Sequence, residues 1–138
     1  MSERVRVGDQ RLSKGRTVTD ADVVIWAGLV HDFTSLHMDA ELMRTSFFGR
    51  TIAHGYIAMT MSVGLFFPED RDFLRPTGLR TVGWDEVRFE RPVHVGDTLR
   101  CRRTVVAVTD QLLVHRVEVL NQDNAVVMSG QERFAFVV

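Results

Sequence analysis

A long run of uncharged residues most constrains how this chain can fold. Residues 51–68 contain no Asp, Glu, Lys or Arg, and most of their side chains are apolar. We predict one helix from Ile52 to Phe67 that ends at Pro68, because proline lacks the N–H that a continuing helix needs. Apolar side chains point to nearly every side of this helix, so the rest of the chain is expected to bury it all round.

A membrane-spanning helix is the competing interpretation, and the length of the run argues against it. A span needs about 20 apolar residues, whereas this run is shorter and is interrupted by His54, two glycines and several hydroxyl side chains. With 138 residues, of which 45% are hydrophobic and 25% charged, the chain resembles a soluble globular protein. The first residues lack the apolar segment of a signal peptide. We therefore expect one domain over residues 1–138, located in the cytoplasm.

Charge and cysteine content narrow the classes of partner. A net charge of −1 gives no electrostatic basis for binding nucleic acid or an acidic membrane surface. Cys101 is the only cysteine in the sequence, so an internal disulfide and a cysteine-based metal cluster are both excluded. We expect neither a metal ion nor a cofactor.

Shorter elements are predicted before the apolar run. Thr19 is a good N-cap for a helix that ends near His31, because acidic residues in its first turn interact favourably with the helix dipole. The other assignments are a short strand within residues 1–18, a loop over Asp32–His37, a helix over Ala40–Arg44 capped by Asp39, and a loop over Thr45–Arg50.

The pattern becomes rich in strands after Pro68. A charged connector at Glu69–Pro76 is followed by strands predicted over Val82–Phe89, Thr98–Val108, Leu112–Leu120 and Ala125–Val138, with a turn at Asn121–Asn124. A strand of about 10 residues spans ~34 Å, which exceeds the ~24 Å of a helix of about 16 residues. A few long antiparallel strands can therefore curl around the apolar helix. Because exposed edge strands are normally covered or paired, we expect a homodimer.

Two segments together carry a resemblance to a known family. Asp32–Asp39 places a carboxylate five positions before a histidine, and Phe48–Gly55 ends in Ala-His-Gly. These segments are similar to the MaoC-like family, which includes (R)-specific enoyl-CoA hydratases, and so are Thr17–Asp22, Arg88–Val93, Gly96–Leu99 and the closing strands. The resemblance spans nearly the whole chain. It implies an α+β hot-dog fold, in which a long antiparallel sheet wraps a central buried helix and two protomers pair edge to edge.

The sequence departs from the family pattern at three places. Thr34-Ser35 stands where the family often has Asn-Pro, and His31 precedes the aspartate where Gly or Ser is usual. Val63, with Ser62 beside it, occupies a helix position where some hydratases have serine. These differences bear on the choice of substrate more than on the class of reaction.

The family implies the hydration of trans-2-enoyl thioesters of CoA or an acyl carrier protein, or the reverse dehydration. Asp32 and His37 would orient one water molecule and exchange its protons. The N–H of Gly55, at the start of the apolar helix, would bind the thioester oxygen. Ser62 is a weaker candidate for the substrate pocket. His54 is expected to be structural, and no role is assigned to the other histidines, His31, His94 and His115.

Three other functions are weighed against hydration. A hot-dog thioesterase would use a carboxylate on the central helix, and residues 52–67 contain none. A metal-dependent hydrolase could use His31-Asp32, His37 and His54, but hydrolases with such a His-Asp pair are all-helical. A non-catalytic module that binds acyl thioesters is the third alternative.

Overall fold

The computed structural model describes residues 5–66 and 78–137. Its helices are α1 (Asp20–Val30), α2 (Ser35–Met38), α3 (Ala40–Arg44) and α4 (Gly55–Phe66). Its strands are β1 (Gln10–Leu12), β2 (Arg16–Thr17), β3 (Gly78–Phe89), β4 (Thr98–Val108), β5 (Leu112–Leu120) and β6 (Val126–Val137). None of the helices in these two ranges is long and apolar enough to cross a membrane.

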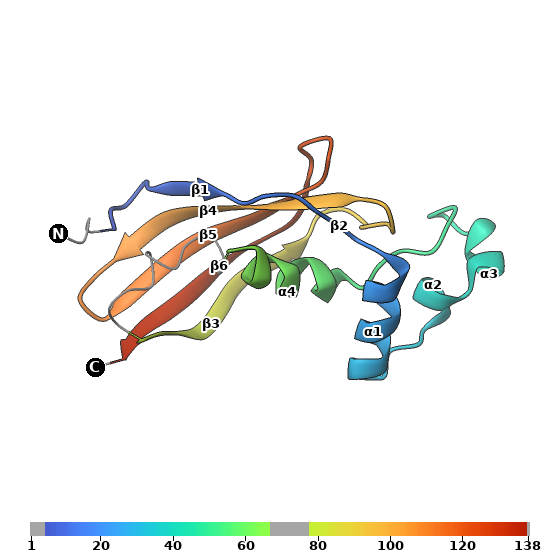
Figure 1. The fold of residues 1–138 in the computed structure, drawn as a ribbon, viewed down its shortest axis with the longest axis horizontal. Coiled ribbons are helices and arrows are strands. Elements are labelled where there is room, and N and C mark those ends of the chain that lie inside the picture. Colours follow the sequence, from blue (N-terminus) through green and yellow to red (C-terminus); the bar gives the residue numbers. More distant parts are fainter. Residues whose placement is uncertain (1–4, 67–77, 138) are drawn as a thin grey trace.

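The strands form one antiparallel sheet in the order β1-β4-β5-β6-β3, and β2 also pairs with β4. Register shifts interrupt the pairing of β3 with β6 and of β4 with β5, and such bulges bend and twist the strands that carry them. Helix α4 lies against one face of the sheet, whereas α1, α2 and α3 gather beyond one end of it (Figure 1). The predicted arrangement of long antiparallel strands around a central helix is confirmed.

The core lies between α4 and the sheet. The inward face of α4 carries Ile57, Ala58 and Phe66, which are each less than 5% exposed. Their apolar neighbours on the strands, Leu99, Val119, Val127 and Met128, are also buried. The sheet therefore holds α4 in place from one side.

Helix α4 differs from its prediction in two ways. It begins at Gly55 and not at Ile52, because the carbonyls of Thr51 and Ile52, which a longer helix would use, accept hydrogen bonds from His94 and His37. It is also not covered all round within this chain, since a stripe of Tyr56, Thr60 and Gly64 is exposed. The predicted end at Phe67–Pro68 and the connector Glu69–Pro76 lie outside the described residues.

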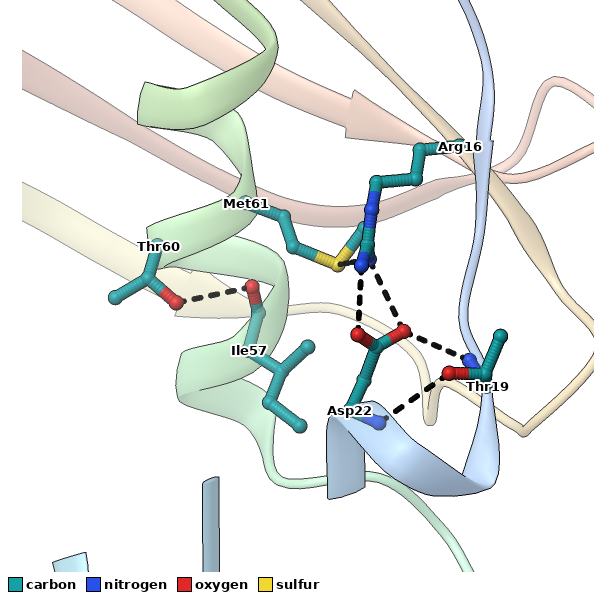
Figure 2. A network of polar contacts seen from close by, with 6 residues as sticks. All are labelled: Arg16, Thr19, Asp22, Ile57, Thr60 and Met61. Carbon is teal, nitrogen blue, oxygen red and sulfur yellow. Dashed lines mark hydrogen bonds and ion pairs between the residues drawn. The ribbon is translucent and has the colours of Figure 1, made fainter. Parts of the chain in front are cut away.

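The start of α1 joins three elements. Thr19 caps the helix as predicted, and the Asp22 carboxylate accepts a hydrogen bond from the N–H of Thr19, completing a capping box. Arg16 of β2 forms an ion pair with Asp22 at 2.6 Å and also contacts the sulfur of Met61 on α4 (Figure 2). The Arg16 guanidinium lowers the pKa of the Asp22 carboxyl. This network docks the first turn of α1 beside α4.

A charged pair is buried in the core, beside the last turns of α4. Arg103 of β4 and Glu132 of β6 approach to 2.6 Å, and their side chains are only 2% and 1% exposed. Thr81 also donates to the Glu132 carboxylate, and the Arg103 guanidinium lies 4.3 Å from the ring centroid of Phe66. The pair links two strands of the sheet to the central helix.

The remaining differences from the sequence predictions are local. The segment assigned as the loop Asp32–His37 contains part of the short helix α2, and the N-terminal strand is divided into β1 and β2. The bounds of β4 and β5 match their predictions, and β3 begins before the predicted Val82.

Candidate active site

The end of α1 and the short helix α2 position Asp32 and His37. His31 ends α1 in a left-handed conformation with φ of 60°, which turns the chain and leads it into Asp32. Helix α2 follows, and the N–H of His37 donates to the carbonyl of Thr34 at 2.9 Å. The two side chains that the sequence placed five positions apart therefore face each other, with 3.7 Å between Asp32 Oδ2 and His37 Nε2.

The hydrogen bonds of His37 determine which ring nitrogen faces the carboxylate. Its Nδ1 lies 2.6 Å from the carbonyl oxygen of Ile52, and because a carbonyl only accepts, Nδ1 carries the proton. In the neutral ring, Nε2 then presents a lone pair towards Asp32. The separation of 3.7 Å is too long for a direct hydrogen bond, but one water molecule can contact both groups.

Hydrogen bonds from Thr34 favour the ionised form of the Asp32 carboxylate. Thr34 donates two hydrogen bonds to Asp32 Oδ1, one from its hydroxyl and one from its N–H at 3.2 Å. The hydroxyl is the main cause that lowers the pKa of the Asp32 carboxyl. The Asp32 side chain is 41% exposed, so its second oxygen is open to solvent and to His37.

His54 joins this pair from the position before α4. Its Nε2 donates to the main-chain carbonyl of Asp32 at 2.9 Å, and its ring stacks on His37 with 3.7 Å between centroids. The His54 side chain is 2% exposed. The sequence indicated only a structural role for this residue, and its contact with His37 was not foreseen.

The same three side chains are the candidates for a metal centre. One ligand atom each from Asp32, His37 and His54 lies within 4.8 Å of the others. The geometry does not favour ligation, because the two imidazole planes are stacked at 28° and their lone pairs cannot both converge on one ion. His54 Nε2 is also occupied by the Asp32 carbonyl, and the exposed His31 lies outside the cluster.

Gly55 is the first residue of α4 and lies directly after His54. Its N–H has no acceptor within residues 5–66 and 78–137, as is usual for the first turn of a helix. A Cβ built on Gly55 would come within 3.0 Å of the Phe89 ring. A larger residue at position 55 would therefore require the Phe89 ring to shift by a few tenths of an ångström.

Other residues that the sequence analysis considered do not join the cluster. Ser62 is fully buried and its hydroxyl donates to the carbonyl of Met59 within α4. His94 contacts the carbonyl of Thr51, and His115 makes edge-to-face contacts with Phe66 and Phe134 in the core.

Thr34 is the residue of this site to which sequence reasoning assigned no role. In the sequence, Thr34 stands out only because it replaces the Asn of the Asn-Pro that is usual in the family. An aspartate that accepts a hydrogen bond from the N–H two residues later is a common turn motif, so Asp32-Phe33-Thr34 did carry a signal for this contact.

The fold and the site together define a class of protein before any relative is considered. A long antiparallel sheet holds a central helix, and an aspartate and a histidine meet near the amino end of that helix. This is a hot-dog protein in which a carboxylate and an imidazole lie side by side. The model of the MaoC-like domain matches residues 4–126, so the chain belongs to the MaoC-like family, as its motifs predicted.

Three similar proteins illustrate this membership. Protein MaoC of Klebsiella aerogenes is 36% identical over 102 residues, which are 74% of this chain and 29% of that protein. The 3-hydroxyacyl-thioester dehydratase Z of Mycobacterium tuberculosis H37Rv is 30% identical over 97 residues, or 68% of this chain and 62% of the dehydratase. The chain thus spans less than two thirds of either relative. The solved (R)-hydratase from A. caviae, involved in PHA biosynthesis, superposes with a TM-score of 0.81 at 26% identity, covering 94% of this chain and 96% of that one.

Proposed function

We propose that this protein is a hydro-lyase that hydrates trans-2-enoyl thioesters to (R)-3-hydroxyacyl thioesters, or dehydrates them in reverse. The observation that carries the proposal is the 3.7 Å approach of Asp32 Oδ2 to the lone pair of His37 Nε2, beside the start of α4. Relatives named as a 3-hydroxyacyl-thioester dehydratase and an (R)-hydratase support the same class of reaction.

The proposed mechanism uses one water molecule between Asp32 and His37. Ionised Asp32 accepts a hydrogen bond from the water and orients it towards C3 of the substrate. His37 Nε2 takes a proton from the water as its oxygen bonds to C3, and then gives a proton to C2. His37 Nδ1 keeps its proton and donates it in a hydrogen bond to the Ile52 carbonyl throughout, so the ring keeps its orientation. In the dehydration direction the same groups act in reverse order.

Negative charge that develops on the thioester oxygen needs a donor. We propose the N–H of Gly55, which is unpaired at the positive end of the α4 dipole. The absence of a side chain on Gly55 lets both the Phe89 ring and a thioester approach the helix. Ser62 remains a weaker proposal for the substrate pocket, because its hydroxyl already donates a hydrogen bond to the carbonyl of Met59.

The carrier of the acyl group is proposed to be CoA or an acyl carrier protein, and the active form a homodimer. Helix α1 exposes Val24, Ile25 and Leu29, whose exposed fractions are 58%, 70% and 72%. The long strand β3 also forms an edge of the sheet, with β6 as its neighbour. Pairing of two copies would cover such edges and apolar side chains. Light scattering at micromolar concentration tests this, and a monomeric mass would contradict it.

Crotonyl-CoA tests the reaction directly. Hydration removes the conjugated enoyl absorbance, and chiral analysis of the product should give the (R)-3-hydroxyacyl thioester. Asp32→Asn should lower kcat by about 10²–10⁴-fold, the range of general acid–base catalysis. Asp39→Asn is the matched control, because Asp39 caps α3 through Leu42 and does not touch the site. Full activity in Asp32→Asn would refute the assignment, and release of free thiol would indicate a thioesterase.

A further inference from the structure

His54 makes one hydrogen bond to Asp32 and one ring contact to His37, the two members of the proposed catalytic pair. We propose that His54 is a positioning residue, which holds the main chain of Asp32 and the ring of His37 in the geometry that one shared water requires. This inference rests on the proposed hydration and adds a residue to it. His54 Nε2 also lies 3.7 Å from Asp32 Oδ2, too far for a direct hydrogen bond, and His54 transfers no proton in this scheme.

The first contact fixes the main chain that carries the carboxylate. His54 Nε2 donates to the Asp32 carbonyl at 2.9 Å. Asp32 follows the left-handed His31, and its side chain is 41% exposed, so little packing restrains it. The bond from His54, which is itself buried, ties this exposed segment to the rigid start of α4.

The second contact fixes the plane of the His37 imidazole. The hydrogen bond from His37 Nδ1 to the Ile52 carbonyl holds one edge of the ring. The His54 ring, stacked at 3.7 Å with planes 28° apart, supports the face of the His37 ring and limits its tilt. The two restraints together direct the Nε2 lone pair of His37 at Asp32.

A role in packing alone does not explain why this residue is histidine. With its proton on Nε2, the buried His54 Nδ1 has no hydrogen-bond partner within the described part of the chain. An unpaired buried acceptor disfavours folding, so an apolar side chain would suit a purely structural position better. A side chain that must both donate to Asp32 and present a flat aromatic face to His37 has to be a ring with an N–H.

Two substitutions separate the two contacts. His54→Gln keeps an amide donor for the Asp32 carbonyl but removes the aromatic face, whereas His54→Phe keeps the face but removes the donor. We expect each to lower kcat by about 10–100-fold, since small misplacements of reacting groups have effects of this size. KM should change by less than about 3-fold, because substrate binding is not the function assigned to this residue. The double variant Asp32→Asn/His54→Gln should be no slower than Asp32→Asn alone.

His115→Gln is the matched control. His115 is another buried histidine in contact with aromatic rings, but it meets Phe66 and Phe134 edge-to-face in the core. This variant should unfold at a lower urea concentration and keep the kcat of the original chain. Equal kcat in either His54 variant and the original chain, or an effect on KM alone, would overturn the positioning role.

A measurement without substrate separates this inference from the proposed function. ¹⁵N NMR of the histidine side chains should report His37 in the Nδ1–H form, with sharp signals that broaden or double in His54→Gln. If the original chain hydrates no enoyl thioester, the proposed function fails, and the NMR result alone then judges whether His54 orders His37. Unchanged His37 signals in both variants would overturn that ordering.

Discussion

Replacing Glu132 by glutamine should destabilise this protein more than the same replacement of Glu118, a carboxylate that is less buried. Glu132 Oε2 lies 2.6 Å from Arg103 Nη1, and the two side chains are 1% and 2% exposed. At an effective dielectric constant of ~20, two unit charges at this distance attract by about 6 kcal/mol. The variant loses this attraction but keeps a buried guanidinium, which still contacts the Phe66 ring and the Ser62 carbonyl. We therefore expect a loss of about 3–5 kcal/mol in the free energy of unfolding.

Urea unfolding followed by circular dichroism measures this loss. For a chain of this length the same change corresponds to a fall in Tm of roughly 10–20 °C. Glu118→Gln is the matched control, because Glu118 pairs with Arg102 at 2.9 Å but with side chains 16% and 34% exposed. Such a pair contributes about 0–1 kcal/mol. The reasoning is refuted if Glu132→Gln is no more destabilising than Glu118→Gln.

Removal of both charges gives a second check on the same reasoning. Arg103→Met combined with Glu132→Leu leaves no buried ion without a partner. The double variant should therefore recover most of the stability that Glu132→Gln loses, because apolar replacements of buried pairs are often neutral or stabilising. A double variant less stable than Glu132→Gln would contradict this explanation.

Three further predictions follow from the pKa directions and burial. Thr34→Val removes the hydroxyl that lowers the pKa of Asp32, so the loss of kcat on the acid side should begin at a higher pH, whereas Thr34→Ser should restore the original profile. Burial, with the Arg103 charge, lowers the pKa of His115 to about 3 from 6.5. Between about pH 3 and pH 6.5, His115 therefore binds a proton in the unfolded chain but not in the folded chain. As the pH falls through this range, the free energy of unfolding should drop by about 1.4 kcal/mol per pH unit. Urea titrations at several pH values measure this drop, and the His115→Phe variant should not show it. Burial also raises the pKa of the Cys101 thiol, so a thiol reagent at pH 8 should label Cys101 only when urea is added.

The sequence allowed prediction of those parts of the fold that depend on local patterns. The bounds of β4 and β5 were correct because each is a long run of strand-forming residues ended by turn residues. The start of α4 was placed too early because the carbonyls of Thr51 and Ile52 accept hydrogen bonds from His94 and His37 and not from the next turn of a helix. Those donors are distant in the sequence, and apolar composition alone continued the helix.

In the candidate site, too, contacts within one short segment were predictable from the sequence, whereas contacts between distant segments were not. The approach of Asp32 and His37 was predictable, since both belong to one short segment whose motif marks them as a pair. The stacking of His54 on His37 was not, because it joins α2 to the start of α4 and depends on how those elements meet in three dimensions. The tautomer of His37 likewise follows from a single carbonyl, that of Ile52, which no local pattern identifies.

The close approach of Phe89 to Gly55 restricts the order in which substitutions can accumulate in descendants of this protein. Any side chain at position 55 would press on the Phe89 ring at 3.0 Å. The ring is 47% exposed and ends β3, so shortening it opens space at modest cost. A lineage that changes residue 55 therefore meets least strain if residue 89 is shortened first, because in the reverse order the Phe89 ring has to shift by a few tenths of an ångström.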